Sequence, residues 1–305
     1  MSQEDAKSRG ADPEPPTDEK QLNAGNYCVS FIDLLGQRAA LHGQGLLPVT
    51  ESEEQRQALT QTLMKSVGSI SALQRRAQAM IDKSGPDPNS ELRAQLSAVE
   101  QLEWDEMSKT KITTQRWSDG LVQFACLSDR EIKCHMNNVF GLFTVTGALC
   151  FMGLASKRPI RGAIEIAWGL ELHPGELYGA AIARAYELES EVASYPRIVI
   201  GPEMLRFLDA YCSDTSTEVF ARADRALAQL CRSMLHVDTD GHVFLHYLGE
   251  AFRSAVTTRN HPALYAKAHE FALEQLKEHR ENKNSKLAFR YSDLLHYFEE
   301  NRPSS

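Results

Sequence analysis

The stretch YCVSFIDLLG, at residues 27–36, decides the fold that we expect of this chain. Its apolar run stops at Asp33 and a glycine follows, which is typical of a buried β-strand with an acidic residue at its carboxyl end. A second stretch, RWSDGLVQF at residues 116–124, has Ser-Asp-Gly between two strand-like runs. This is the turn chemistry of a hairpin, with Asp119 at its tip. Two strand-end carboxylates that meet in space are the usual protein ligands of Mg²⁺ in a site that acts on a nucleoside triphosphate.

Each carboxylate also has a simpler interpretation. Asp33 alone is compatible with the N-cap of a following helix, and Asp119 alone with an ordinary turn residue. The two aspartates are remote in sequence, but a ferredoxin-like sheet places the first strand beside the hairpin, so that both project from neighbouring strand ends. The pair, in this order, therefore favours a shared metal site over two unrelated roles.

The composition is that of a soluble globular protein, and the length suffices for one large domain or for a domain with additions. The chain has 305 residues, of which 42% are hydrophobic and 24% charged, and its formal net charge is −8. This charge argues against a nucleic-acid surface that is read by bulk charge, although a local pocket can still bind a small anion. The apolar stretch 139–155 is interrupted by threonines and glycines and is shorter than the roughly 20 residues of a membrane span. We therefore expect a buried helix there and no direct membrane insertion.

The remaining compositional signals concern the N-terminus and the cysteines. Residues 1–24 are polar, acidic and rich in proline, so we expect a disordered tail. They contain no hydrophobic signal segment, and we expect a cytoplasmic protein. The six cysteines form no Cys-x-x-Cys pair, which predicts reduced cysteines rather than disulfides or a metal site. The spacing of His236, His242 and His246 matches no zinc signature.

Periodicity and turn residues predict an alternation of strands and helices. Strands are expected at 27–35, 110–117, 120–127, 160–169 and 197–201, and in a hairpin around Asp240-Gly241. Helices are expected at 53–82, 90–107, 129–155 (capped by Ser128 or Asp129), 179–192, from Pro202, at 219–234, 262–282 and 285–300. This order predicts an α+β, ferredoxin-like fold, a four-stranded and mainly antiparallel sheet backed by helices. The fold would occupy residues 25–255, followed by a C-terminal helical extension at 256–305.

Three segments together resemble the class III nucleotidyl cyclases, and most closely the pyrimidine cyclases of bacterial antiphage signalling (the Pycsar cyclases). FIDLLG at 31–36 is similar to the first metal motif of that family, and WSDG at 117–120 to the second. RGAI at 161–164 and GAAIARAYELE at 179–189 are similar to its final strand, loop and helix. The resemblance spans residues 27–201, with a weaker echo at 286–297. It implies the class III cyclase fold and two Mg²⁺ or Mn²⁺ ions per active site.

The resemblance also implies roles for particular residues. The metal ligands would be Asp33, Asp119 and the backbone carbonyl of Leu34. Gly36 would let the backbone amides of Leu35 and of Gly36 itself approach phosphate oxygens; a tight turn that needs glycine is the alternative.

The base-reading positions depart from those of purine cyclases. Gln115 stands where such enzymes carry a lysine, which suits a pyrimidine but also a decayed pocket. Glu176 matches the second base-contacting position, where a carboxylate accepts from the N4 amine of cytosine or the N3–H of uracil. The alternative for Glu176 is a solvated loop acid.

The last helix departs from the family as well. Its usual Asn and Arg positions hold Ala183 and Glu187. The role of the missing arginine, stabilisation of charge on the transferring phosphoryl group, is assigned to Arg184. The alternative for Arg184 is a surface ion pair with Glu187.

Several other charged residues are secondary candidates. Arg116 and Arg161 are further phosphate candidates, and for Arg161 we favour a structural ion pair. Lys286 and Arg290, on the last helix, either reach phosphate or form a solvated face, and we favour the solvated face. Asp238 and Asp240 are interpreted as turn residues.

The function expected from these motifs is pyrimidine nucleotidyl cyclisation. UTP, or CTP, would be converted to its 3′,5′-cyclic monophosphate and pyrophosphate by two-metal catalysis. The resemblance implies a homodimer with active sites at the interface, and a product that activates a separate effector protein in antiphage defence. Two alternatives remain open: a cyclase-like module that senses a nucleotide without turnover, and a purine (ATP or GTP) cyclase.

Overall fold

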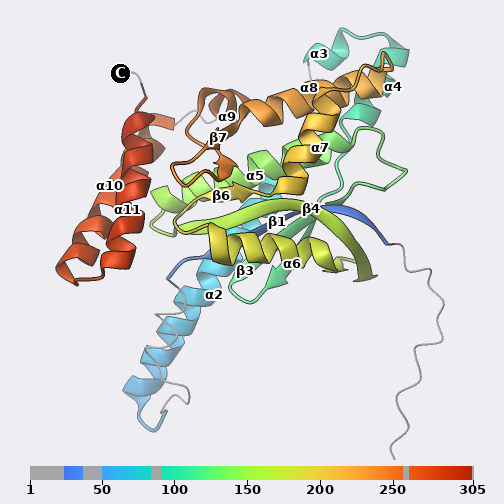
Figure 1. Cartoon of the computed structure of the whole chain (residues 1–305). Helices are drawn as coiled ribbons and strands as arrows, with labels where there is room; N and C mark the ends of the chain where they lie inside the picture. Colours follow the sequence, from blue (N-terminus) through green and yellow to red (C-terminus); the bar gives the residue numbers. More distant parts are fainter. Residues whose placement is uncertain (1–23, 37–49, 84–90, 257–260, 304–305) are drawn as a thin grey trace, which may run out of the picture.

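The computed structural model describes residues 24–36, 50–83, 91–256 and 261–303, which form an α+β protein (Figure 1). Its strands are β1 (Gly25–Leu34), β2 (Thr113–Trp117), β3 (Gly120–Cys126), β4 (Ile160–His173), β5 (Glu176–Tyr178), β6 (Ile198–Ile200), β7 (Leu235–Val237) and β8 (Val243–Leu245). Its helices are α2 (Glu53–Ile81), α3 (Glu91–Ala94), α4 (Ala98–Met107), α5 (His135–Ala155), α6 (Ala180–Glu187), the π-helical segment η1 (Leu188–Val192), α7 (Pro202–Cys212), α8 (Val219–Ser233), α9 (Glu250–Ala255), α10 (His261–Glu281) and α11 (Ser285–Glu300). The predicted tail at 1–24 lies outside the described residues, apart from Ala24.

The described strands form one mixed, open sheet in the order β2-β3-β1-β4-β6-β8-β7, with β5 paired to β4. All pairs between these strands are antiparallel except β4–β6. The prediction of a mainly antiparallel sheet is therefore confirmed, whereas the predicted number of four strands is wrong, because the sheet has eight. The short strand β6 and the β7–β8 hairpin continue the sheet along an edge of β4 that four strands would have left unpaired.

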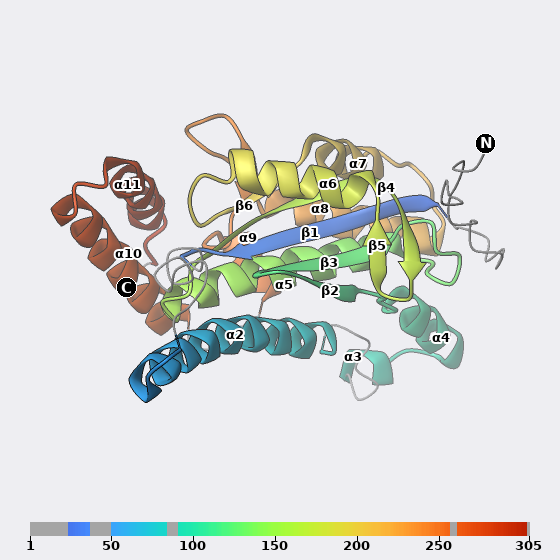
Figure 2. The same cartoon turned by 90° about the horizontal axis from the view of Figure 1, so that it is seen from below.

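Helices cover both faces of this sheet (Figure 2). One face carries Cys28, Ile32 and Leu34 of β1 and packs against α5 and the C-terminal half of α2 in the main core. The other face carries Val29 and Phe31 of β1 and packs against α6. The alternation along β1 is the period of two that a strand covered on both faces requires. Asp33 follows Phe31 in this alternation and therefore belongs to the α6 face.

Two predicted helices differ from the structure near their N-terminal ends. The helix expected at 129–155 begins at His135, because Asp129 instead accepts hydrogen bonds from the Glu131 backbone and the Lys111 ammonium. The first turn of α5 is capped by Asp224 of α8, which accepts from the Met136 N–H at 2.9 Å. The helix expected at 90–107 is broken before α4, which starts with a capping box in which Ser97 and Glu100 bond reciprocally.

Helix α5 is long and apolar enough to cross a membrane, and it is the one described helix of that kind. Most of its side chains are buried inside the protein, between the sheet, α8 and α10. The prediction of a buried helix in this region is therefore confirmed. All six cysteines are free, as expected, and four of them are buried.

The predicted C-terminal helices are present as the antiparallel pair α10 and α11. They form a hairpin at the end of the sheet where β1 stops and β4 begins (Figures 1 and 2). The hydroxyl of Tyr297 accepts a hydrogen bond from the Leu248 N–H at 3.0 Å, and that of Tyr265 donates to the Phe298 carbonyl. These buried contacts attach α11 both to the body of the protein and to α10.

Candidate functional site

Asp33 is the second-last residue of β1, and β1 lies between β3 and β4 in the sheet. In the strand register it stands opposite Gly120 of β3 and opposite Arg161 of β4. Gly120 in turn stands opposite Trp117 of β2. Gly120 contributes no side chain to this row, and a Cβ atom there would lie 2.9 Å from the Ile32 carbonyl oxygen. The absence of a side chain leaves the Asp33 carboxylate next to the hairpin turn that carries Asp119.

Asp119 lies close enough to Asp33 for its charge to act on the Asp33 carboxyl. Burial raises the pKa of Asp33 to about 7, and the neighbouring carboxylates of Asp119 and Glu189 add to this increase. The Arg161 guanidinium and a backbone hydrogen bond from Leu34 act in the opposite direction but do not offset burial. Asp33 and the turn that carries Asp119 therefore lie at the same sheet end, where the charge of Asp119 acts on Asp33.

A third carboxylate at this end, Glu189, was not found by sequence reasoning. It lies in the π-helical segment after α6, is 2% exposed, and forms an ion pair with Arg161, which is 18% exposed. The expected structural ion pair of Arg161 is therefore confirmed. In the sequence Glu189 is one of three acids in ELESE, and nothing there shows which of them turns inward. A π-helical turn shifts the facing of the residues after it, and such turns occur often at functional sites.

The donor set at this end fits a divalent cation only in part. Two carboxylates suit Mg²⁺ or Mn²⁺, and a cation between them would remove their repulsion. Glu189 is already paired with Arg161, and no cluster of three or more His, Cys, Asp or Glu side chains placed to hold a metal occurs among the described residues. Most ligands of such a cation would then come from water, from the Leu34 carbonyl and from substrate phosphates, which is how Mg²⁺ is commonly bound.

The backbone after β1 is held in place by β4. The Leu35 N–H donates to the Pro159 carbonyl at 3.0 Å, so this amide already has a partner. Gly36 is exposed and has a φ of 89°, the left-handed region that favours glycine. Both predicted phosphate-contacting positions therefore lie beside Asp33, with the amide of Leu35 engaged within the chain.

The two predicted base-reading residues lie together at the β5 strand. Gln115 of β2 accepts a hydrogen bond from the Leu177 N–H at 3.1 Å, and Leu177 directly follows Glu176. Among the described residues no hydrogen bond uses the Gln115 amide nitrogen, which can therefore donate to a ligand, and the Glu176 side chain is exposed. The register places Gln115 opposite Val122, two residues from the row of Asp33, so that this pair lies further along the same α6 face.

Arg184 is not brought to the carboxylates within this chain. It is exposed on the outer side of α6, and its charge helps to lower the pKa of Glu165, a buried carboxylate whose pKa burial raises. Glu165 accepts hydrogen bonds from the N–H groups of Ile166 and of Met204 in the first turn of α7. The alternative prediction for Arg184 was a surface ion pair with Glu187. No such pair occurs among the ion pairs of the described residues.

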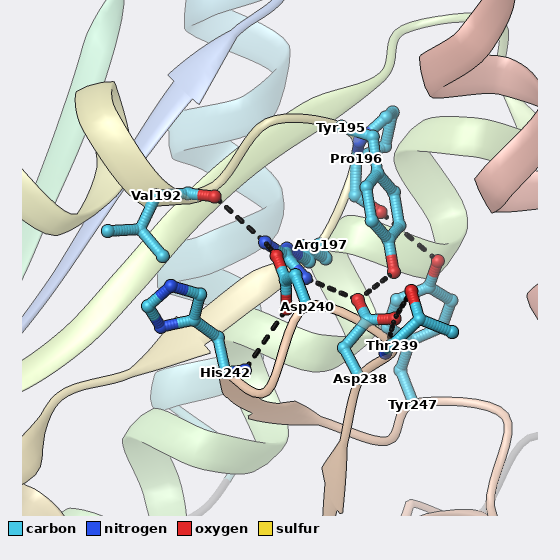
Figure 3. A network of polar contacts seen from close by, with 9 residues as sticks. All are labelled: Val192, Tyr195, Pro196, Arg197, Asp238, Thr239, Asp240, His242 and Tyr247. Atoms are coloured by element: carbon cyan, nitrogen blue, oxygen red, sulfur yellow. Dashed lines mark hydrogen bonds and ion pairs between the residues drawn. The ribbon is translucent and has the colours of Figure 1, made fainter.

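Asp238 and Asp240, interpreted above as turn residues, have a further role. Both accept from the guanidinium of Arg197, which is 1% exposed and also donates to the Val192 carbonyl (Figure 3). The Tyr195 hydroxyl donates to Asp238 as well. This network joins the start of β6 to the β7–β8 hairpin and holds the end of the π-helical segment that carries Glu189.

Comparisons with known proteins identified no relative of this chain. Neither protein-family models, nor curated proteins, nor solved structures gave a match to the chain.

Proposed function

We propose that this protein is a pyrimidine nucleotidyl cyclase of the class III fold, which acts on UTP or CTP. One observation supports the proposal most strongly: Asp33 and Asp119 share one sheet end in the strand order β2-β3-β1-β4. The chain order β1, α2, β2, β3, α5, β4 with this pairing is that of the split βαββαβ unit. Both aspartates and this arrangement were expected from the resemblance to the cyclases.

The proposed reaction needs little from the protein beyond positioning and charge. The 3′-hydroxyl oxygen forms a bond to the α-phosphorus, the bond from that phosphorus to the bridging oxygen breaks, the hydroxyl proton passes to solvent, and pyrophosphate leaves. Divalent ions held by Asp33 and Asp119 would supply charge neutralisation for the attacking and leaving oxygens. Arg161, fixed by Glu189, adds a positive charge beside the same carboxylates.

Base recognition is proposed for the pair at β5. The Gln115 amide nitrogen can donate to a pyrimidine carbonyl, and the Glu176 carboxylate can accept from a ring N–H or an exocyclic amine. Arg184 is proposed to act in the site of a second protomer, because its own chain places it away from Asp33. Trp117 and Tyr186, which are 46% and 49% exposed and both contact Phe31 beside Asp33, support a homodimer interface on this face. The product is proposed to act as a cytoplasmic second messenger on a separate effector.

The decisive experiment is turnover. Purified protein with Mn²⁺ is incubated with each radiolabelled triphosphate (ATP, GTP, CTP or UTP), and the products are separated by chromatography. We expect one pyrimidine triphosphate to give its cyclic monophosphate, and Asp33→Ala and Asp119→Ala to abolish this. Asp82→Ala, an exposed aspartate at the end of α2, serves as the matched control. Absence of product from all four triphosphates, with folded protein, would refute the proposal.

A second candidate function is a nucleotide sensor without turnover. It is favoured by the exposed Ala183 and Glu187 on α6, where the purine cyclases carry an Asn and an Arg. This alternative predicts thermal stabilisation by one triphosphate, which depends on Asp33, without any product. A purine cyclase is the remaining alternative. Competition among ATP, GTP, CTP and UTP for turnover distinguishes it from the pyrimidine cyclase, because a purine cyclase would prefer ATP or GTP.

A further inference from the structure

Arg161 stands beside Asp33 but is paired with a different carboxylate. The two residues are directly opposite each other in the β1–β4 pair, so their side chains leave the sheet on the same face. Opposite charges in such a position attract each other across the strands. Among the described residues, however, no hydrogen bond or ion pair joins Arg161 to Asp33, and the guanidinium donates to Glu189 instead. Glu189 thus holds an arginine that Asp33 would otherwise attract.

The more deeply buried of the two carboxylates holds the arginine. Glu189 is 2% exposed, whereas Asp33 is partly exposed. A carboxylate without access to water depends on a cationic partner, because hydration cannot replace that partner. Asp33 keeps access to solvent and to the cations dissolved in it. This difference in burial explains why Arg161 pairs with Glu189 rather than with Asp33.

Glu189 is held against Arg161 by the elements on either side of it. It continues the buried side of α6, since it follows the buried Ala185 by four residues. Beyond it, the Arg197 guanidinium donates to the Val192 carbonyl at 2.8 Å and fixes the end of η1 (Figure 3). Two aspartates of the β7–β8 hairpin in turn hold that guanidinium. The position of Glu189 is therefore determined from both sides.

We propose that Glu189 is a positioning residue, which keeps Arg161 off Asp33 and so leaves the Asp33 carboxylate free to bind a divalent cation. This inference rests on the proposed function and extends it. If Arg161 paired with Asp33, a cation would have to break that ion pair before it could bind. With Arg161 held aside by Glu189, the positive charge stays near the site, where a guanidinium suits substrate phosphates, without occupying the carboxylate.

The first test measures Mn²⁺ binding to the full-length protein without nucleotide, by calorimetric titration. Glu189→Gln keeps the shape of the side chain and removes its charge, so Arg161 should turn to Asp33. We expect the Kd for Mn²⁺ to rise about 10- to 100-fold, the usual effect of losing a residue that supports a metal ligand. Glu191→Gln, which removes an exposed acid from the same segment, is the matched control and should bind Mn²⁺ as the wild type does. Glu189→Asp, which keeps the charge, should lose less affinity than Glu189→Gln.

The second test needs no metal and observes the arginine itself. The ¹H–¹⁵N NMR signal of the Arg161 side-chain Nε–H is assigned by its loss in Arg161→Lys. In Glu189→Gln, the addition of Asp33→Asn should shift this signal strongly, because the guanidinium then loses its new partner. In the wild-type background, Asp33→Asn should move the signal little. This comparison separates a change of partner from an effect of charge through space.

The outcomes separate this inference from the proposed function. Unchanged Mn²⁺ affinity in Glu189→Gln, shown to be folded by circular dichroism, or an equal loss in Glu191→Gln would overturn the role of Glu189 and leave the cyclase proposal standing. An arginine signal that ignores Asp33→Asn in the Glu189→Gln background would also overturn it. So would a strong response in the wild-type background, a result that needs no folded Glu189 variant. If the wild type binds no Mn²⁺ and turns over no triphosphate, the proposed function fails, and the arginine signal alone decides whether Glu189 diverts Arg161.

Discussion

Asp33→Asn should change how stability depends on pH in the metal-free protein. The pKa of Asp33 is raised from 3.8 to about 7 by burial and by Asp119 and Glu189. A carboxylate whose pKa is higher in the folded state binds more protons there than in the unfolded state. Its contribution to the free energy of unfolding is therefore complete below about pH 4 and is lost as the pH rises towards 7. The wild type should be destabilised at pH 8 relative to pH 5 by this one group.

The magnitude follows from the two pKa values. Each pH unit between them changes the free energy of unfolding by about 1.4 kcal/mol, which amounts to about 2.5 kcal/mol between pH 5 and pH 8. Asp33 is partly exposed, so this figure is an upper value. Asparagine cannot ionise, and the Asp33→Asn variant should lack this part of the pH dependence. Relative to the wild type, the variant should gain stability as the pH rises.

The assay is urea unfolding in EDTA at half-unit steps from pH 5 to pH 8. The difference in unfolding free energy between variant and wild type should grow by about 1 to 2.5 kcal/mol across this range. Glu281→Gln, which removes an exposed carboxylate at the end of α10, should leave the pH slope unchanged. Parallel pH profiles for wild type and Asp33→Asn would refute the reasoning, since they would mean that Asp33 is not desolvated beside Asp119. With added Mg²⁺, stabilisation of the wild type should grow with pH and be absent in Asp33→Asn.

Three further predictions concern single contacts. Asp119→Asn removes one of the charges that raise the pKa of Asp33, and this pKa should fall, as measured by carboxyl NMR titration of the metal-free protein. Arg197→Met leaves two carboxylates of the β7–β8 hairpin without their buried partner and should destabilise the fold by about 3 to 5 kcal/mol in urea unfolding, whereas an unchanged midpoint would contradict the network. Gly201→Ala places a Cβ atom 2.2 Å from a carboxylate oxygen of Glu165 and should cost about 1 to 3 kcal/mol, and wild-type stability would show that this contact relaxes freely.

Much of the fold was predictable because its signals are local. The strand that ends at Asp33, the hairpin that turns at Asp119, the amphipathic helix at 53–82 and the two C-terminal helices all agree with the structure. Each depends on a side-chain period or on turn residues within a few positions. The prediction for the start of α5 was wrong because its cap, Asp224, comes from another helix, and no local pattern encodes a partner 88 residues away.

The candidate site divides in the same way. The sequence by itself determined that Asp33 stands at the end of a strand and Asp119 in a hairpin turn, because strand ends and turns follow from the order of apolar and polar residues. Only the tertiary structure decided that Glu189 turns inward to pair with Arg161 and that Arg197 joins Asp238 to Asp240. The physical reason is that the charge partner of a side chain is whatever the folded chain places within a few ångströms of it. Distance along the sequence does not contain that information.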